Sequence, residues 1–142
     1  MIKKINNLSP NELEEIIQIW LTANGEAHPF IPASYWRDNL DFVREQLPQA
    51  TLYVYHEKNK IIAFLGMNEQ HISGIFVKRP YRSQGIGQKL LNTVKNNHER
   101  LTLSVYAKNQ KAVKFYMNQG FKQLNEQLDN TGELEYHLVW EK

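Results

Sequence analysis

A glycine-rich turn that joins an apolar strand directly to an amphipathic helix constrains the fold most strongly. Residues 71–78 become apolar on both faces in their second half, as in a central strand, and residues 86–94 carry apolar side chains at helical spacing. Gly85 and Gly87 lie in the turn between them. A helix N-terminus has unpaired backbone N–H groups and partial positive charge, and glycine lets an anion approach them. The turn therefore indicates a phosphate-binding site, although a tight strand-to-helix connection explains the glycines almost as well.

Two common phosphate-binding motifs do not fit this turn. The pattern Gly-x-x-x-x-Gly-Lys-Ser/Thr is absent, and Leu90 occupies the position where a dinucleotide fingerprint needs its third glycine. Nucleic-acid binders usually concentrate basic charge on one face, whereas this chain has a formal net charge of only +2. Its densest basic patch surrounds the turn and consists of Lys78, Arg79, Arg82 and Lys89. A small polyanion is therefore a better ligand than a nucleic acid.

Hydrophobic periodicity and turn signals predict the element order β-α-α-β-β-β-α-β-α-β-β. Strands are expected at residues 1–5, 51–56, 61–67, 71–78, 101–106, 121–128 and 133–140. The first helix begins with a capping box at Ser9 and ends at Asn24-Gly25, and a second helix follows Pro32 and stops before Pro48. Two further helices begin at the glycine turn and at Asn109. This order predicts an α/β domain with a mixed sheet and helices on both faces.

Length and composition predict a single intracellular domain, residues 1–142. The hydrophobic share of 42% and the charged share of 23% are ordinary for a soluble globular protein. No apolar run approaches membrane-spanning length, and the N-terminus has no secretory pattern, so we expect a cytoplasmic protein with no membrane contact. The absence of cysteine excludes thiolate catalysis, disulfides and cysteine-ligated metals, and no metal site is expected.

A second motif directly follows the strand at residues 101–106. It consists of Asn109, Ala112, Phe115, Tyr116, Gly120 and Phe121. Together with Arg82-x-x-Gly85-x-Gly87 it resembles motifs A and B of the GNAT acetyltransferases in spacing and in strand or helix context. Trp20 and residues 30–36, 66–71 and 135–140 are similar to the acetyltransferases typified by YjaB. The resemblance implies the GNAT fold, α/β (α+β): a mixed, mostly antiparallel sheet of about seven strands flanked by four helices and splayed at its two central strands.

The resemblance also implies acetyl-CoA as co-substrate and assigns binding and catalytic roles. Backbone groups of Ile75, Phe76 and Val77 would pair with the pantetheine arm. Main-chain N–H groups of the glycine turn would bind the pyrophosphate; the turn comprises Arg82, Ser83, Gln84, Gly85, Ile86, Gly87 and Gln88. Asn109 would hydrogen-bond the CoA arm, and Tyr116 would protonate the departing thiolate. A lone aromatic side chain in a short helix usually packs in a core, but Asn109 and Gly120 at the family spacing favour the catalytic role for Tyr116.

The residue that accepts the proton of the amine is less defined by the sequence. Alkyl amines such as lysine carry a proton at neutral pH. His71 opens its strand where several family members have a carboxylate, and an imidazole suits the task, but an exposed strand-end histidine is an equally good interpretation. Other relatives have a glutamate on the next strand, where this chain has Ser104. Glu69 is a weaker candidate, and proximity of amine and thioester supplies part of the rate in any case.

The acceptor pocket of GNAT proteins is formed by the segment that here contains His28, Phe30, Tyr35 and Trp36. These aromatic residues suit an amine carried on an apolar body, although core packing explains Trp36 equally well. We therefore expect an acetyl-CoA-dependent N-acetyltransferase that acts on a small-molecule or peptide primary amine, as a monomer or homodimer. The alternative is a non-catalytic acetyl-CoA-binding sensor of the same fold. A nucleic-acid-binding α/β protein is disfavoured by the near-neutral charge.

Overall fold

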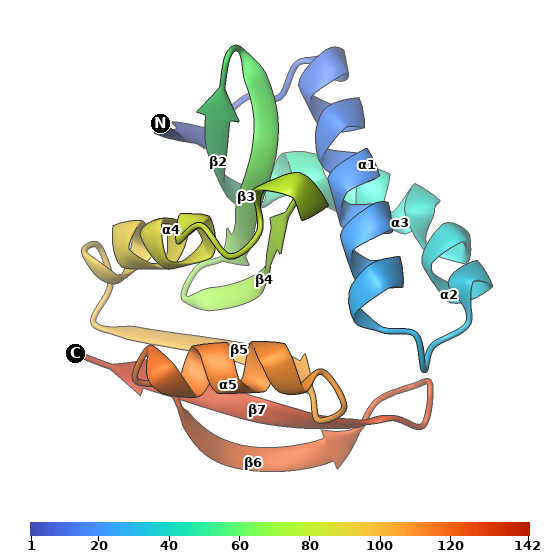
Figure 1. Ribbon diagram of the computed structural model, residues 1–142, viewed down its shortest axis with the longest axis vertical. Helices are drawn as coiled ribbons and strands as arrows, with labels where there is room; N and C mark the ends of the chain where they lie inside the picture. The colour runs from blue at the N-terminus through green and yellow to red at the C-terminus, as the bar shows by residue number, and fades with distance from the viewer.

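The structure is a computed structural model that describes residues 1–142, and its seven strands form one mixed sheet (Figure 1). The strand order is β1-β2-β3-β4-β5-β7-β6. The strands are β1 (Ile2–Ile5), β2 (Thr51–Glu57), β3 (Lys60–Asn68), β4 (His71–Val77), β5 (Arg100–Tyr106), β6 (Lys122–Leu128) and β7 (Leu134–Glu141). All neighbouring strands are antiparallel except β4 and β5. The predicted mixed, mostly antiparallel sheet is confirmed.

The structure contains five α-helices, whereas the sequence predicted four. They are α1 (Pro10–Ala27), α2 (Ala33–Asp38), α3 (Leu40–Gln46), α4 (Ile86–Lys95) and α5 (Gln110–Asn118). The predicted second helix is divided at Asn39, whose φ of −94° and ψ of 0° lie outside the helical region. The Asn39 side-chain amide donates to the Tyr35 carbonyl at 2.7 Å, which is the local competition that asparagine offers to helical hydrogen bonds.

Helix α1 begins as predicted but ends later. The capping box is present: the Glu12 N–H donates to Ser9 Oγ at 3.1 Å, and the Ser9 N–H donates to Glu12 Oε1 at 2.9 Å. The predicted stop at Asn24-Gly25 is wrong, because the Asn24 side chain donates to the Trp20 carbonyl at 2.9 Å inside the helix. The additional turn carries Glu26 to the functional site described below.

Helices cover both faces of the sheet, as predicted. Helices α1 and α3 pack on one face, where Ile16 and Ile17 contact Leu52 and Phe64 in a buried cluster. Helix α4 covers the other face with three fully buried side chains, Leu90, Leu91 and Val94 (Figure 1). Its apolar residues therefore occupy the positions that the helical periodicity predicted. No helix of the chain has the length and apolar character needed to cross a membrane.

Strands β4 and β5 separate after a short parallel pairing. They pair at His71 with Thr102 and at Ile72 with Leu103, and the register continues no further. The remaining half of β4 stays paired with β3 on its other side, for example Ile75 with Leu65. One backbone edge of β4 therefore has no strand partner, and the expected splay at the two central strands is confirmed.

Candidate active site

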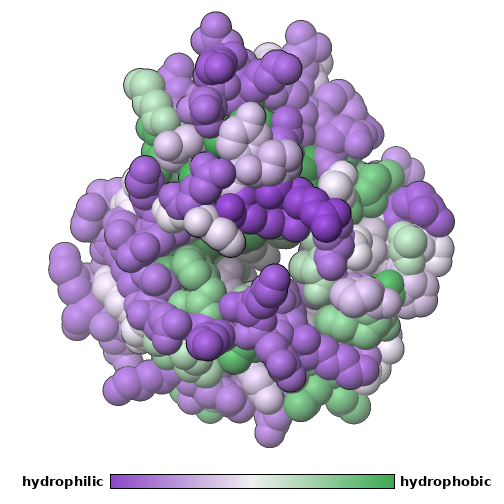
Figure 2. Space-filling model, viewed as in Figure 1, coloured by the Kyte–Doolittle hydropathy of each residue, from purple (hydrophilic) through white to green (hydrophobic).

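A cavity of about 1180 Å³ occupies the space between the separated strands. Figure 2 shows the molecule hollowed at this point, with hydrophilic side chains above and below the opening and hydrophobic ones beside it. The cavity is lined by most of the residues that the family resemblance singled out: Ile75, Phe76, Val77, Arg82, Ser83, Gly85, Ile86, Gly87, Gln88, Asn109 and Tyr116. Two expected site residues, Gln84 and His71, do not line it; the Gln84 side chain donates to the Pro80 carbonyl at 3.2 Å instead.

The glycine turn presents the backbone N–H groups at the start of α4 to this cavity. Gly85 is the N-cap residue, and the Lys89 N–H donates to its carbonyl at 3.0 Å, so the N–H groups before Lys89 have no helical partner. The φ of Gly85 is +82°, a left-handed conformation that glycine adopts without cost. A Cβ at this position would meet no protein atom within 4 Å, because it would project into open space. The turn can therefore accommodate an anion.

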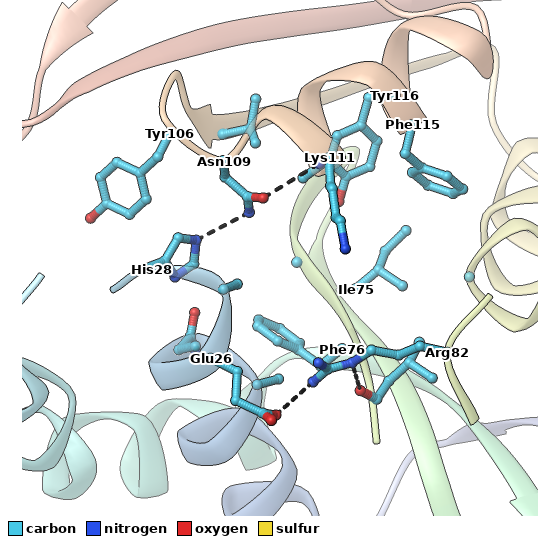
Figure 3. A pocket seen from close by; sticks show the side chains of 18 of the residues that line it. Glu26, His28, Ile75, Phe76, Arg82, Tyr106, Asn109, Lys111, Phe115 and Tyr116 are labelled. Carbon is cyan, nitrogen blue, oxygen red and sulfur yellow. Dashed lines mark hydrogen bonds and ion pairs between the residues drawn. The ribbon is translucent and has the colours of Figure 1, made fainter. Parts of the chain in front are cut away.

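The arginine of the turn is held by protein groups. Arg82 Nε donates to the Val77 carbonyl at 2.9 Å, and its terminal nitrogen lies 2.9 Å from Glu26 Oε1 (Figure 3). The other oxygen of Glu26 lies 3.3 Å from Arg79. Glu26 itself lines the cavity, so a carboxylate stands beside the predicted phosphate site. Sequence reasoning missed this ion pair, because it ended α1 before Glu26 and the two residues are 56 positions apart.

A second unexpected charge comes from α5. Lys111 lines the cavity, and Figure 3 shows its side chain directed into it. It has no carboxylate partner, whereas Lys108 pairs with Glu133 at 2.9 Å. Lys89, which the sequence placed beside the phosphates, does not line the cavity and lies over the Tyr55 ring, 6.0 Å from its centroid. Lys111 therefore supplies the unpaired positive charge of the site.

We predict that Glu26→Gln strengthens acetyl-CoA binding. The substitution removes a negative charge that would repel the phosphates from a cavity wall near the turn. One interaction between solvent-exposed charges is worth about 1 kcal/mol, or roughly a fivefold change in Kd. Calorimetric titration checks this, and the gain should shrink as salt is added. Glu14→Gln, which breaks an ion pair with Arg44 away from the cavity, serves as the control. Weaker binding by Glu26→Gln would instead show that the carboxylate orients Arg82 for the ligand.

Helix α5 brings Asn109 and Tyr116 to the opposite wall. Asn109 caps the helix, with its Oδ1 accepting from the Ala112 N–H at 3.4 Å. Tyr116 follows about two helical turns later, on the same side of α5. The Tyr116 ring is 7% exposed and packs edge-on against Phe121, while its hydroxyl group points into the cavity (Figure 3). Burial raises the pKa of Tyr116 above its ordinary value, so the phenol is firmly protonated at neutral pH.

Aromatic rings form the end of the cavity near the α1–α2 loop. The His28 ring centroid lies 5.0 Å from that of Tyr106 and 5.3 Å from that of Trp36, and Phe30 packs edge-on against Tyr106 at 5.6 Å. All four line the cavity, as expected for His28, Phe30 and Trp36. Trp36 is both buried and part of the wall. Tyr35 does not line the cavity, because its hydroxyl donates to Asn130 at 3.3 Å.

Strand β7 adds a carboxylate that sequence reasoning missed. Glu135 pairs in register with Tyr106 of β5 and lines the cavity beside the aromatic rings. Its Oε1 lies 3.6 Å from the Nε2 of His137, on the same sheet face. The available sequence signal was the alternation of Glu135 and His137 with apolar residues of the last strand. The register that pairs His137 with Ser104 is set by contacts between distant strands. Of the two carboxylates in the wall, Glu26 is bound to arginines and Glu135 is not.

The structure does not bring His71 to the cavity. Its Nδ1 lies 2.9 Å from Thr102 Oγ1 at the start of the β4–β5 pairing, before the strands separate. Burial and the nearby charge of His137 lower the pKa of His71. Glu69 is exposed in the β3–β4 turn, with a φ of +54°. Ser104 does line the cavity, but a serine cannot replace the glutamate that some relatives have there.

Comparison with known proteins identifies the class. The family model of the acetyltransferase (GNAT) domain matches residues 25–138. The chain therefore belongs to the GNAT acetyltransferase family, as the two motifs predicted, and it is an acyltransferase that transfers acetyl groups to amines. The structure contains no group of three or more histidine, aspartate or glutamate side chains that could hold a metal ion together.

The most informative relatives are from Escherichia coli. The chain is 38% identical over 119 residues to the peptidyl-lysine N-acetyltransferase YiaC, an alignment that covers 82% of both chains. It is 32% identical over 123 residues to the peptidyl-lysine N-acetyltransferase YjaB, covering 86% of this chain and 84% of the relative. The solution structure of the apo form of YjaB matches with a TM-score of 0.84 and 28% identity, covering 99% of this chain and 97% of that one.

Proposed function

We propose that this chain uses acetyl-CoA to acetylate the ε-amino group of lysine side chains in proteins or peptides. The observation that supports this most is a single cavity with chemically distinct ends. A turn with unpaired N–H groups lies at one end, aromatic rings and a carboxylate that no arginine or lysine holds lie at the other, and the Tyr116 hydroxyl faces the space between them. The relatives YiaC and YjaB are peptidyl-lysine N-acetyltransferases, which supports lysine as the acceptor.

The cofactor end fits acetyl-CoA through backbone groups more than through side chains. The turn offers unpaired N–H groups to a pyrophosphate, and Lys111 offers a positive charge. The unpaired edge of β4 at Ile75–Val77 can pair with the amides of the pantetheine arm, as a strand would. When bound, acetyl-CoA supplies an activated acetyl group as its thioester. An N–H on the same β4 edge is in a position to stabilise an oxyanion on the thioester carbonyl.

The acceptor end fits an amine at the tip of an apolar stem. Phe30, Trp36 and Tyr106 provide aromatic surfaces along which the four methylene groups of lysine can pack. Glu135 provides a carboxylate that attracts the ammonium group, and the ring faces attract it as well. Because the cavity opens to solvent and has no carboxylate cluster, a side chain projecting from a peptide suits it better than a highly charged polyamine.

Titration with acetyl-CoA, followed by mass spectrometry of a lysine-containing peptide, tests the proposal. We expect micromolar binding of acetyl-CoA, with no comparable binding of ATP or NAD, and a mass increase of one acetyl group on the lysine side chain. A peptide with a free N-terminus and no lysine serves as the control. Acetylation of only the N-terminal peptide would reassign the acceptor. Binding without turnover of any amine would instead identify an acetyl-CoA-binding sensor.

A further inference from the structure

We propose that His28 is the residue that accepts the proton of the attacking amine, and that Asn109 determines when it can do so. The inference rests on the proposed acetyl transfer and concerns the step that neither the motifs nor His71 explain. His28 is the only histidine that lines the cavity. It lies at the aromatic acceptor end and reaches across to Asn109, the residue expected to contact the CoA arm (Figure 3). It therefore stands where the amine and the thioester would meet.

The backbone of His28 is fixed by the end of α1. His28 is the C-cap residue, and its N–H donates to the Asn24 carbonyl at 3.0 Å. Its ring is held between Trp36, Phe30 and Tyr106, with centroids within 5.6 Å of each. The later end of α1, which sequence reasoning missed, is what places the imidazole in this position. A side chain held by three rings has little freedom to move, which is a requirement for a proton acceptor in a defined geometry.

Hydrogen bonds define the tautomer of His28. Asn109 Oδ1 accepts from the Ala112 N–H, so its Nδ2 is the atom that lies 3.3 Å from His28 Nε2. An amide NH₂ group is a donor only, so Nε2 must carry the lone pair and the ring proton must be on Nδ1. Nδ1 is buried and has no hydrogen-bond partner. The basic nitrogen of a neutral imidazole is therefore directed at Asn109 and the cofactor side of the cavity.

The surroundings of His28 favour the neutral form in the free protein. Burial lowers the pKa of His28 more than the nearby Asn24 carbonyl raises it. Other charged or titratable groups around it come from every neighbouring element: Tyr106 with its partner Asp129, Glu135 on β7, Lys108 over the Phe30 ring, and Glu26 on α1. Because its pKa is lowered, His28 stays neutral until the pH falls below the ordinary imidazole range near 6.5. It is thus ready to accept a proton at neutral pH.

The lysine ammonium group first loses one proton to solvent, because only the neutral amine has a lone pair with which to attack. The lone pair of the neutral amine forms a C–N bond at the acetyl carbonyl, and the C–S bond breaks with its electron pair on sulfur. His28 Nε2 takes the proton lost by the nitrogen, and the Tyr116 hydroxyl gives a proton to the sulfur. Solvent then removes the proton from His28 and returns one to Tyr116. The nitrogen of the attacking amine becomes far more acidic once the C–N bond has formed, so a base of lowered pKa suffices.

Asn109 controls this step because its amide opposes a proton on Nε2. Protonated His28 would direct an N–H at the NH₂ group of Asn109, and two donors cannot form a hydrogen bond. The proton can be held only when the Asn109 amide has turned away, as it would to bond the CoA arm. The base therefore becomes competent after the cofactor has bound. This order of events keeps His28 from holding a proton when no coenzyme is bound.

An NMR titration of the five histidine imidazoles tests whether Asn109 governs the protonation of His28, and it does not require a measurement of activity. In the free protein the His28 ring should titrate below the ordinary value, and added CoA should raise its midpoint by about one unit, the effect of one hydrogen bond. Asn109→Ala should raise the midpoint without CoA. Signals are assigned with single histidine-to-glutamine variants. A His28 midpoint that CoA and Asn109→Ala both leave unchanged would overturn the role of Asn109.

Kinetics of three histidine variants test the role of His28 itself. His28→Gln should lower kcat by about 10²-fold or more, with acetyl-CoA affinity nearly unchanged, because general-base catalysis contributes about 10²–10⁴-fold. His56→Gln on β2 is the control outside the cavity. His71→Gln is the competing assignment: a large loss there with His28→Gln active would overturn the proposal. Imidazole added to His28→Ala should restore part of the rate. If wild-type protein transfers no acetyl group at all, the proposed function fails and not this assignment.

Discussion

Replacing Tyr116 with phenylalanine is expected to lower kcat for acetyl transfer by about 10²-fold or more while acetyl-CoA affinity stays within about twofold. The hydroxyl group points into the cavity and takes part in none of the side-chain hydrogen bonds of the protein. Its removal therefore leaves no protein group without a partner, and the ring keeps its packing against Phe121. A loss of rate without a loss of stability would assign the hydroxyl to the reaction.

The raised pKa of Tyr116 makes the expected pH dependence specific. A phenol whose pKa lies above its ordinary value near 10 remains protonated through the whole neutral range. It should therefore cause no alkaline loss of rate below about pH 10. The burial that raises this pKa would also disfavour a charged thiolate beside the Tyr116 hydroxyl, which favours transfer of the proton to the sulfur.

Tyr53→Phe is the matched control for this measurement. Tyr53 is equally buried, at 6% exposure, but lies on β2 and does not line the cavity. It should keep wild-type kcat. If Tyr116→Phe also kept wild-type kcat, protonation of the thiolate would come from solvent and the motif-derived role would be wrong.

Local sequence signals were sufficient where the structure depends on local chemistry. The capping box at Ser9, the left-handed Gly85 and the cap at Asn109 each depend on residues within four positions of one another. Their side chains decide the backbone conformation directly, so the start of α1 and the two functional motifs lie as predicted. The separation of β4 and β5 followed from the family resemblance, and the short parallel pairing confirms it.

Local sequence signals failed to predict helix boundaries where one residue type can either end a helix or lie within it. Asn24 before Gly25 is a common helix end, yet here the asparagine bonds back to the Trp20 carbonyl and the helix continues. Asn39 makes the same kind of bond to Tyr35 and divides a helix. Tertiary packing decides between these outcomes: Asn24 is only 6% exposed inside the continuing helix, whereas Asn39 is half-buried where the helix divides. A single sequence does not contain that information.

The acceptor end of the site was the least predictable part. Glu26, Glu135 and Lys111 reach the cavity through the end of a helix, the register of two strands and the face of α5. Long-range contacts also explain why His28 reaches the cavity and His71 does not. His71 occupies a family position on β4 but precedes the point where the strands separate, whereas His28 is carried into the cavity by the α1 end. Which of two histidines faces a site depends on contacts between distant segments.

Gly85→Val is expected to weaken acetyl-CoA binding by about 100-fold, or about 2.7 kcal/mol, and to destabilise the fold by about 1–3 kcal/mol. The two effects have separate causes. A φ of +82° is costly for a β-branched residue, which lowers stability. The new side chain projects into the open space beside the α4 N-terminus, which is the space that a bound pyrophosphate would fill.

Gly132→Val separates these causes. Gly132 has a φ of +86°, and a Cβ there would also meet nothing within 4 Å, but it lies in the β6–β7 turn outside the cavity. The same backbone strain should therefore lower its melting temperature about as much as that of Gly85→Val, without weakening acetyl-CoA binding. Thermal unfolding and calorimetric titration of both variants measure the two effects independently. Equal affinities for the two variants would mean that strain alone acts at Gly85, and that the phosphates bind elsewhere in the cavity, with Lys111 as the first alternative.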